Sequence, residues 1–546
     1  MAQLMAIVGS GFLAQSIASL FNGSSQVVWL GSIVNIICTA LALPFSQAAD
    51  LLGRRWFIAI PTAFGCAGGI IVSRAESMAT IIGGFCVLGV SYGAQPLLLA
   101  VASEVLPRRH RPIVQATANV CAGVGAIIGL CMGGALIKDG NLENFRIYFY
   151  VNAGAFALAS AICLALYNPP PRENGLGLTV QEKARRLDWV GYVAMPIGLV
   201  LFSIGLYWAE NPHPWGSAQV LAPLVVGAVI LACWGVYETR WQKEGMLHRV
   251  LFQRRNFGLA LAAIGAEGFV FFICNNYLPY EVSVFKPGDI LVVGSHFTLV
   301  FAVSIPAALV ISALASWKKI VRLPMVLGFF LFMLFCILMA TSSRYTSASA
   351  FWGFPVILGM GFGACLPSLF SAAQLGTPPE LIGLATGLMV ASRGVGGVLA
   401  LAINNAIFNA RLSTLGSKIA DATLPLGLPP ASLPSLITAL MTHDDALLEN
   451  VEGVTQQIIV AGGSAVLGVY ERGFRDVWIC ASCVAFAALA AVSFTNDPSG
   501  EFTRHIDATV EILPAEHISG KEQSVDTEVS NLDKGLERAQ HRDHVE

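Results

Sequence analysis

Charged residues are scarce in this chain. Asp, Glu, Lys and Arg make up 12% of its 546 residues, about half of their share in a soluble globular protein. Apolar residues account for 55%, and the mean hydropathy is +0.67, an excess too large for one buried core. We therefore expect a polytopic membrane protein whose outer surface faces the lipid bilayer. The net charge of -2 argues against nucleic acid as a partner.

Motifs for a cofactor, a metal or a nucleotide are also missing. The twelve cysteines are mostly isolated in apolar runs, as expected of reduced thiols that pack as small apolar residues. The one C-x-x-C pair, Cys480 and Cys483, lies in an apolar helix without a second pair. No G-x-x-x-x-G-K-[ST] loop is present, so an ion gradient, of protons in the simplest case, is the expected energy source. An intramembrane enzyme would need a catalytic pair, such as two His or two Asp at one depth, and we find none.

Fourteen stretches are apolar enough to be membrane-spanning helices, which need about 20 residues. They are residues 4–21, 27–48, 57–73, 78–103, 114–136, 148–167, 187–208, 218–237, 257–278, 291–317, 323–340, 350–370, 381–408 and 477–494.

Lys and Arg are distributed unevenly between the loops. Alternate loops hold 17 of them, near residues 54–55, 108–111, 172–186, 240–255 and 318–322, whereas the other short loops hold five. Basic loops are retained in the cytosol. We therefore expect both ends of the chain to be cytosolic.

This topology assigns the remaining segments. Asn22 begins a glycosylation acceptor triplet and would lie in the first exterior loop. Residues 409–476 would form a long exterior loop, in which the apolar run 458–469 is too short to span the membrane. Residues 495–546 are polar and charged, which predicts a disordered cytosolic tail.

The loop after the second predicted span is compact and charged. Asp50, Gly53, Arg54 and Arg55 lie within six residues. The carboxylate can accept charge-assisted hydrogen bonds, and the arginines can pair with it or with a neighbouring helix end. Such a loop suits a latch that holds one conformation of a carrier. A simple cytosolic anchor would explain the arginines equally well.

Glycines recur in the fifth predicted span, at Gly125, Gly129, Gly133 and Gly134. Glycines four residues apart lie on one face of a helix and let another backbone approach closely. A helix of this kind could bend or slide in a conformational change. Ordinary packing of small residues is the alternative.

These two motifs resemble those of the major facilitator superfamily. The charged loop matches the signature loop after its second helix, and the glycines match the fifth-helix motif of its antiporter branch. Fourteen spans are typical of the branch with two extra central helices. Further stretches resemble the fungal trichothecene efflux pump family and related siderophore carriers. They are residues 50–57, 103–104, 107–112, 167–170, 188–191 and 205–215.

The chain also departs from these patterns. Ser46 and Leu51 stand where the signature loop usually has Gly and a basic residue, and Leu130 replaces a usual Pro. Phe85 stands about where many drug–proton antiporters carry an Arg. The last departure puts the standard proton route of those antiporters in doubt.

The resemblance implies an all-α polytopic membrane protein of the major-facilitator type. Residues 1–167 and 257–494 would form two six-helix bundles, and residues 168–256 would carry two inserted helices and cytosolic linkers. A small-molecule substrate would bind between the bundles and be exposed to each side in turn. The expected function is proton-coupled efflux of organic toxins, drugs or secondary metabolites, at the plasma membrane or alternatively the vacuolar membrane.

Two charged residues fall deep in predicted spans, where charge is costly and often functional. Glu267, in the ninth span, could bind and release a proton. Arg393, in the thirteenth span, is the best cationic candidate and could be its counter-charge, although the sequence does not show that they meet. A structural ion pair or a snorkelling side chain is the alternative for each.

Polar residues near these charges could line a substrate cavity or hydrogen-bond between helices. They are Asn275, Asn276, Tyr277, Asn404 and Asn405. Glu104, just before a basic loop, is interpreted as a partner of the cytosolic gate. His296 is interpreted as a polar residue near a loop rather than a proton relay.

Two other functions remain open at this point. The same fold could take up a ferric chelate, as siderophore carriers do. A nutrient sensor with the shape of a carrier would also suit the long exterior loop and the tail.

Overall fold

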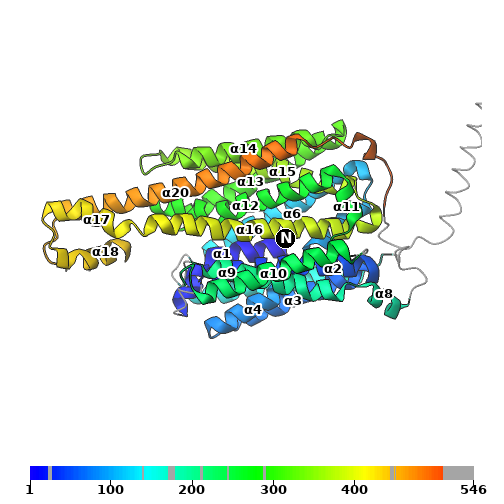
Figure 1. Cartoon of the computed structure of the whole chain (residues 1–546), viewed down its shortest axis with the longest axis horizontal. Coiled ribbons are helices and arrows are strands. Elements are labelled where there is room, and N and C mark those ends of the chain that lie inside the picture. Colours follow the sequence, from blue (N-terminus) through cyan, green and yellow to red (C-terminus); the bar gives the residue numbers. More distant parts are fainter. Residues whose placement is uncertain are drawn as a thin grey trace, which may run out of the picture.

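The computed structural model describes residues 1–21, 27–137, 141–169, 179–209, 213–242, 245–286, 290–442, 448 and 451–507. Within these ranges every regular element is helical, apart from an isolated bridge between Ala209 and His213. Thirteen helical segments are long and apolar enough to cross a membrane, and most run along the long axis of the molecule (Figure 1). The predicted all-α polytopic fold is confirmed. The count of fourteen is not, since α1 (Ala2–Leu20) is helical but is not among the thirteen.

The helices of the first third of the chain pack together, and we call them the N-terminal group. They are α1, α2 (Val27–Leu52), α3 (Arg54–Ser73), α4 (Met78–Val90), α5 (Gln95–Val105), α6 (Arg111–Ile137) and α7 (Phe145–Leu166). The fourth predicted span was expected to be one helix. A 3-10 turn, Ser91–Ala94, divides it into α4 and α5, because Pro96 lacks the N–H that would continue the α-helical bonding.

The C-terminal group contains the six long helices of the second half. They are α12 (Arg255–Phe285), α13 (Ile290–Lys318), α14 (Arg322–Ala340), α15 (Ala348–Leu375), α16 (Ile382–Leu412) and α20 (Gln456–Ser493). The two groups meet where α2 packs along α16 and α6 packs along α13. In Figure 1, α2, α3 and α4 lie in the lower half, and α13, α14 and α15 lie in the upper half.

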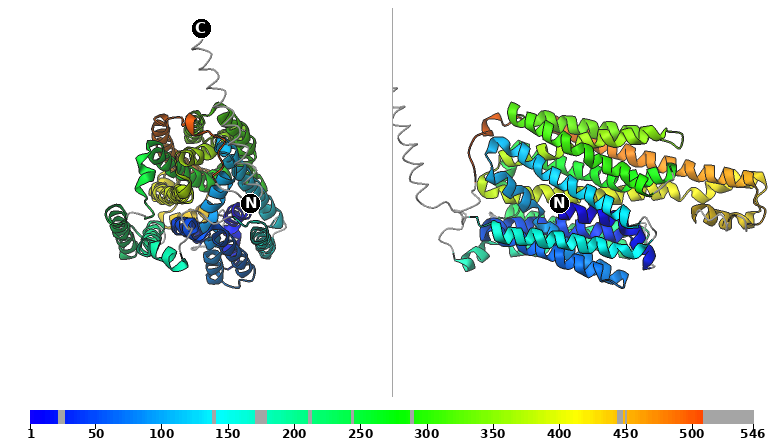
Figure 2. Two further views of the ribbon diagram at one scale, coloured as in Figure 1. Left: turned by 90° about the vertical axis from the view of Figure 1, so that its right-hand side faces the viewer. Right: turned by 180° about the vertical axis from the view of Figure 1, so that it is seen from behind.

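Two further long helices lie between the groups in sequence. α9 (Trp189–Trp208) and α10 (Ala218–Arg240) pack against one another, and α9 also contacts α2 and α16. Few residues of α10 are buried. The end-on view in Figure 2 shows this pair at the edge of the molecule.

The predicted exterior loop is shorter than expected and partly helical. α16 continues to Leu412 and α20 begins at Gln456, so the apolar run 458–469 is the first part of a 38-residue helix. That helix is about 57 Å long, well beyond the roughly 30 Å of a bilayer core, and it projects from the bundle (Figure 1). The loop between the two helices contains α17 (Leu415–Thr423) and α18 (Leu433–Thr442) and has a small apolar core of its own. We call this end of the molecule the loop end.

The opposite end carries those arginines of the predicted cytosolic loops that the structure describes, and we call it the basic end. Residues 495–507, which were expected to belong to a disordered tail, are ordered here. They contact Arg108 in the turn before α6, Arg322 at the start of α14 and Asn256 at the start of α12. The rest of the predicted tail and Asn22 lie outside the described residues.

The arrangement predicts that the loop end and the basic end face opposite sides of the membrane. We expect an epitope tag inserted after the exposed Gly427 to be labelled on intact cells. A tag after Glu546 should be labelled only after permeabilisation, because basic loops stay in the cytosol. Labelling of the C-terminal tag on intact cells would reverse the orientation.

Candidate functional site

The two helix groups are joined at the basic end by a buried charged cluster centred on Arg54. Its guanidinium donates to Asp50 Oδ1 at 2.9 Å and to Glu104 Oε1 at 2.8 Å. All three side chains are almost completely buried. Gly53 makes the turn that brings Arg54 back toward Asp50, since its φ of 103° is a conformation that favours glycine. The predicted pairing of Glu104 with the gate loop is thus present.

Asp50 also reaches across to the C-terminal group. Its Oδ2 accepts the backbone N–H of Leu384 at 3.0 Å, in the first turn of α16. A carboxylate is stabilised at the N-terminus of a helix, where unpaired N–H groups carry partial positive charge. A Cβ on Gly383 would lie 2.4 Å from the carboxylate, so only glycine permits this approach.

A second set of polar residues joins the groups beside this cluster. The Gln374 side chain of α15 accepts from Ser103 Oγ at 2.7 Å and donates to Thr386 Oγ1 at 2.9 Å. Gln115 donates to Ser103 and to Gln374, and Arg111 donates to the backbone carbonyl of Gln374. All five side chains are buried. We call these five residues, together with the charged cluster of Asp50, Arg54 and Glu104 and with Leu384, the seam.

The other predicted gating residues lie within the N-terminal group. Arg55 donates to Asn168 and to the carbonyl of Leu164, at the end of α7. Cβ atoms on Gly125 and Gly129 would collide with the backbone of Met1 and Met5, so this glycine face holds α1 against α6. Gly133 and Gly134 are buried in the same helix.

At mid-molecule the structure brings Glu267 and Arg393 together. Arg393 Nε lies 2.6 Å from Glu267 Oε2, and Nη2 lies 3.1 Å from Oε1. Glu267 is fully buried and Arg393 is 21% exposed. The pair meets because α12 and α16 cross with backbone contact, where a Cβ on Gly396 would lie 1.9 Å from the carbonyl oxygen of Gly265.

A cavity of about 320 Å³ lies between the groups on the loop-end side of this pair, and we call it the outer cavity. Asn275, Asn276, Tyr277 and Asn405 line it, and the Tyr277 hydroxyl donates to Asn405 at 2.9 Å. Of the described residues that line it, none carries a charge. The other lining residues are Ile7, Val8, Gly11, Ala14, Ser32, Tyr207, Phe271, Phe272, Tyr280, Leu401 and Phe408.

Phe271 connects the outer cavity to the ion pair. Its ring lines the cavity, and the guanidinium of Arg393 lies 4.6 Å from the ring centroid, within cation–π range. On its other side Arg393 faces a small cavity of about 90 Å³, shared with Gln95, Gln115 and Asn119 of the N-terminal group. Arg393 therefore lies between the outer cavity and the seam.

Two predicted polar residues lie outside this path. The Asn404 amide donates to the Ala400 carbonyl of its own helix and does not line the outer cavity. His296 lies at the loop end of α13, bonds the Val292 carbonyl and stacks on Trp352.

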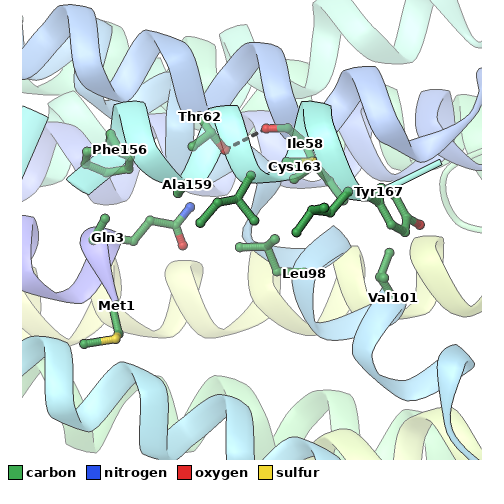
Figure 3. Close-up of a pocket in the computed structure, with 13 residues that line it drawn as sticks. Met1, Gln3, Ile58, Thr62, Leu98, Val101, Phe156, Ala159, Cys163 and Tyr167 are labelled. Atoms are coloured by element: carbon green, nitrogen blue, oxygen red, sulfur yellow. Dashed lines mark hydrogen bonds between the residues drawn. The ribbon is translucent and has the colours of Figure 1, made fainter. Parts of the chain in front are cut away.

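A further cavity, of about 340 Å³, lies inside the N-terminal group (Figure 3). Met1 and Gln3 line it together with apolar residues of α3, α5 and α7. Thr62 donates to the Ile58 carbonyl in its own helix, so its hydroxyl hydrogen is already used. The described residues that line this cavity all lie between Met1 and Tyr167, and we do not assign it to the transport path.

Sequence reasoning missed buried carboxylates outside the predicted site, among them Glu281 and Glu238. Glu281 is fully buried in α12, three residues beyond the predicted span 257–278. It accepts from Trp478 Nε1 at 2.5 Å and from the Ser342 hydroxyl. No basic side chain in the described ranges pairs with it. The stretch Val282–Phe285 that follows Glu281, apolar except for Ser283, was the available signal that the helix continues.

A cavity between two helix groups, closed at one end by a polar seam, is the geometry of an alternating-access carrier. The family model for the Major Facilitator Superfamily matches residues 1–401. The chain belongs to this superfamily. It is therefore a membrane transporter rather than an enzyme, and the predicted superfamily is confirmed.

Similar major facilitator transporters are found in fungi. The MFS-type transporter ucsD of Acremonium sp is 27% identical over 413 residues, which cover 73% of this chain and 67% of that protein. Efflux pump FUS6 of Gibberella moniliformis is 24% identical over 468 residues, covering 85% of this chain and 80% of that pump. These relatives agree with the predicted resemblance to fungal efflux pumps.

Solved transporters share the fold of this major facilitator protein. An auto-inhibited peptide transporter of the POT family aligns with a TM-score of 0.54 over 91% of this chain and 96% of its own, at 12% sequence identity.

The seam predicts that transport depends on the charge of Asp50 and on Arg54. We expect Asp50→Asn and Arg54→Ala to lower transport below about a tenth of the wild-type rate with expression intact, because hydrogen bonds to charged groups contribute about 1.5–3 kcal/mol. Transport of a substrate by vesicles would be the measurement.

Arg55→Ala is the matched control, since Arg55 is adjacent in sequence but donates to Asn168 and Leu164, at the end of α7, rather than across the seam. Its transport should stay near the wild-type rate. Normal transport by both Asp50→Asn and Arg54→Ala would show that the loop after α2 is only a cytosolic anchor.

Proposed function

We propose that this transporter exports neutral, amphipathic organic molecules from the cell in exchange for protons. The observation that carries the proposal is the outer cavity, which combines aromatic walls with three amides and, among the described residues, has no charged lining side chain. Apolar walls with a few polar groups are typical of small-molecule sites. The relatives FUS6 and LUC4 are named efflux pumps, which supports the direction of transport.

The charge distribution supports an outward-facing arrangement for this structure. The basic end would be cytosolic by the positive-inside rule, and the seam closes it. The outer cavity lies on the loop-end side, which would be exterior. Substrate would leave from this cavity, and the reverse arrangement would open the seam and close the loop end. Export from the cell would require the carrier to lie in the plasma membrane.

Proton coupling would act through Glu267 and Arg393. With the pair intact, Arg393 is held by Glu267 and rests on Phe271. A proton on Glu267 would remove the charge that holds the guanidinium. Arg393 could then turn toward Gln95 and Asn119, and Phe271 could move into the outer cavity. Protonation of Glu267 would thus move the Phe271 ring into the space that the substrate occupies, so that proton and substrate would exclude one another.

The coupling proposal predicts a specific loss in Glu267→Gln, which cannot titrate. In proteoliposomes the variant should still exchange substrate but lose accumulation driven by an imposed pH gradient. Glu281→Gln is the matched control, because Glu281 is buried in the same helix but lines neither cavity near Arg393. If Glu267→Gln and Glu281→Gln both respond to the gradient as wild type does, the proton route lies elsewhere. If only Glu281→Gln loses the response, the route passes through Glu281.

The cavity proposal predicts that two adjacent asparagines behave differently. Asn405→Leu should raise the KM for export about fivefold to tenfold, since a lost hydrogen bond contributes about 1 kcal/mol. Asn404→Leu should leave the KM unchanged, because Asn404 does not line the outer cavity.

The assay is efflux of neutral, cationic and anionic fluorescent compounds from cells that express each variant. Preferred efflux of neutral compounds is expected. Inward transport of a ferric chelate, with no efflux of any compound, would favour a siderophore carrier instead.

A further inference from the structure

The segment that follows α20 connects the two helix groups across the basic end. At its beginning it is tied to the C-terminal group. Asn496 exchanges two hydrogen bonds with Asn256 of α12, at 2.7 and 3.0 Å. Asp497 Oδ1 accepts the backbone N–H groups of Val321 and Arg322 at 2.6 and 2.8 Å, which caps the start of α14.

Further along, the same segment is tied to the N-terminal group. The N–H of Arg108 donates to the His505 carbonyl at 3.0 Å, and the N–H of Arg109 donates to the Thr503 carbonyl at 2.9 Å. Phe502 is buried in the main apolar core. The segment therefore follows the turn before α6 for several residues rather than touching it at one point.

The last described residue of the segment, Asp507, occupies a site made by two arginines. Its carboxylate accepts from Arg108 Nε at 3.0 Å and Nη2 at 2.7 Å, and from Arg111 Nη2. The Asp507 side chain is only 1% exposed. A buried carboxylate is favourable only with such partners, so the two arginines form a specific carboxylate-binding site.

Arg111 makes this site part of the seam. Its Nη2 binds Asp507, and its Nη1 donates to the carbonyl of Gln374 at the end of α15. The guanidinium thus bridges the segment and the C-terminal group. Separation of the groups at the basic end would break the hydrogen bond from Arg111 to Gln374. As long as Arg111 also binds Asp507, its side chain is held in the closed position.

We propose that Arg108 and Arg111 form a docking site for the Asp507 carboxylate, and that the segment 499–507 that carries it is a releasable strap that holds the basic end closed. The inference rests on the proposed alternation of the two groups. It adds a point of control, since removal of the strap would favour the arrangement that is open at the basic end. Any process that neutralises Asp507 or withdraws the segment would shift the carrier toward that arrangement.

The test measures distance and not transport, so its outcome is separate from that of the proposed function. Spin labels at the exposed positions Leu106 and Glu380 would report the separation of the groups at the basic end in the full chain. Asp507→Asn should raise the ratio of open to closed molecules roughly tenfold, as expected for the loss of hydrogen bonds to a charged group. Arg108→Ala should also raise the ratio of open to closed molecules. The variant that combines Asp507→Asn with Arg108→Ala should show no higher ratio than Asp507→Asn alone.

Asp421→Asn is the control, because Asp421 is an exposed carboxylate paired with Lys418 at the loop end. It should leave the distances unchanged. Arg108→Ala keeps the contact of Arg111 with Asp507 and provides the test if Asp507→Asn fails to fold. Unchanged distances in the folded variants, or additive effects of the two substitutions, would overturn the proposal.

Discussion

The contact of Asp50 with the start of α16 is the constraint on which the closed basic end depends. A carboxylate in a nearly dry environment needs hydrogen-bond donors for both oxygens. Asp50 obtains one from Arg54 in its own group and one from the Leu384 N–H in the other group. The buried charge of Asp50 therefore favours contact between the two groups. The contact can be broken if other donors, such as water, replace the N–H group of α16.

The remaining features follow along one path between the helix groups. The seam closes the basic end, Arg393 and Glu267 lie beyond it, and Phe271 separates that pair from the outer cavity. Along this path, each side chain that can change its charge or position is in direct contact with the next. Coupling through such contacts would need no distant transmission, because the outer cavity, the ion pair and the seam all include residues of α16.

Features carried by local sequence were predictable. Asp50, Gly53 and Arg54 are close in the chain, so their spacing alone indicated a charged turn. Glu267 and Arg393 are 126 residues apart, and only the crossing of α12 and α16 shows that they meet. Gln374 and Thr386 were missed because a single polar residue in an apolar helix does not reveal the face on which it lies. The start of α20 was missed because charged residues such as Glu471 and Asp476 interrupt its apolar run, whereas a helix that extends past the membrane can expose them.

The central claim is that the seam must open for transport, and a reversible cross-link tests it most directly. Ser103 and Gln374 contact one another across the seam, so Ser103→Cys with Gln374→Cys can be joined by a short thiol cross-linker in a background without other reactive cysteines. The account predicts that the linked carrier still binds substrate from the loop end but does not transport it, and that reduction restores transport. Transport at the wild-type rate by fully linked protein would contradict the account.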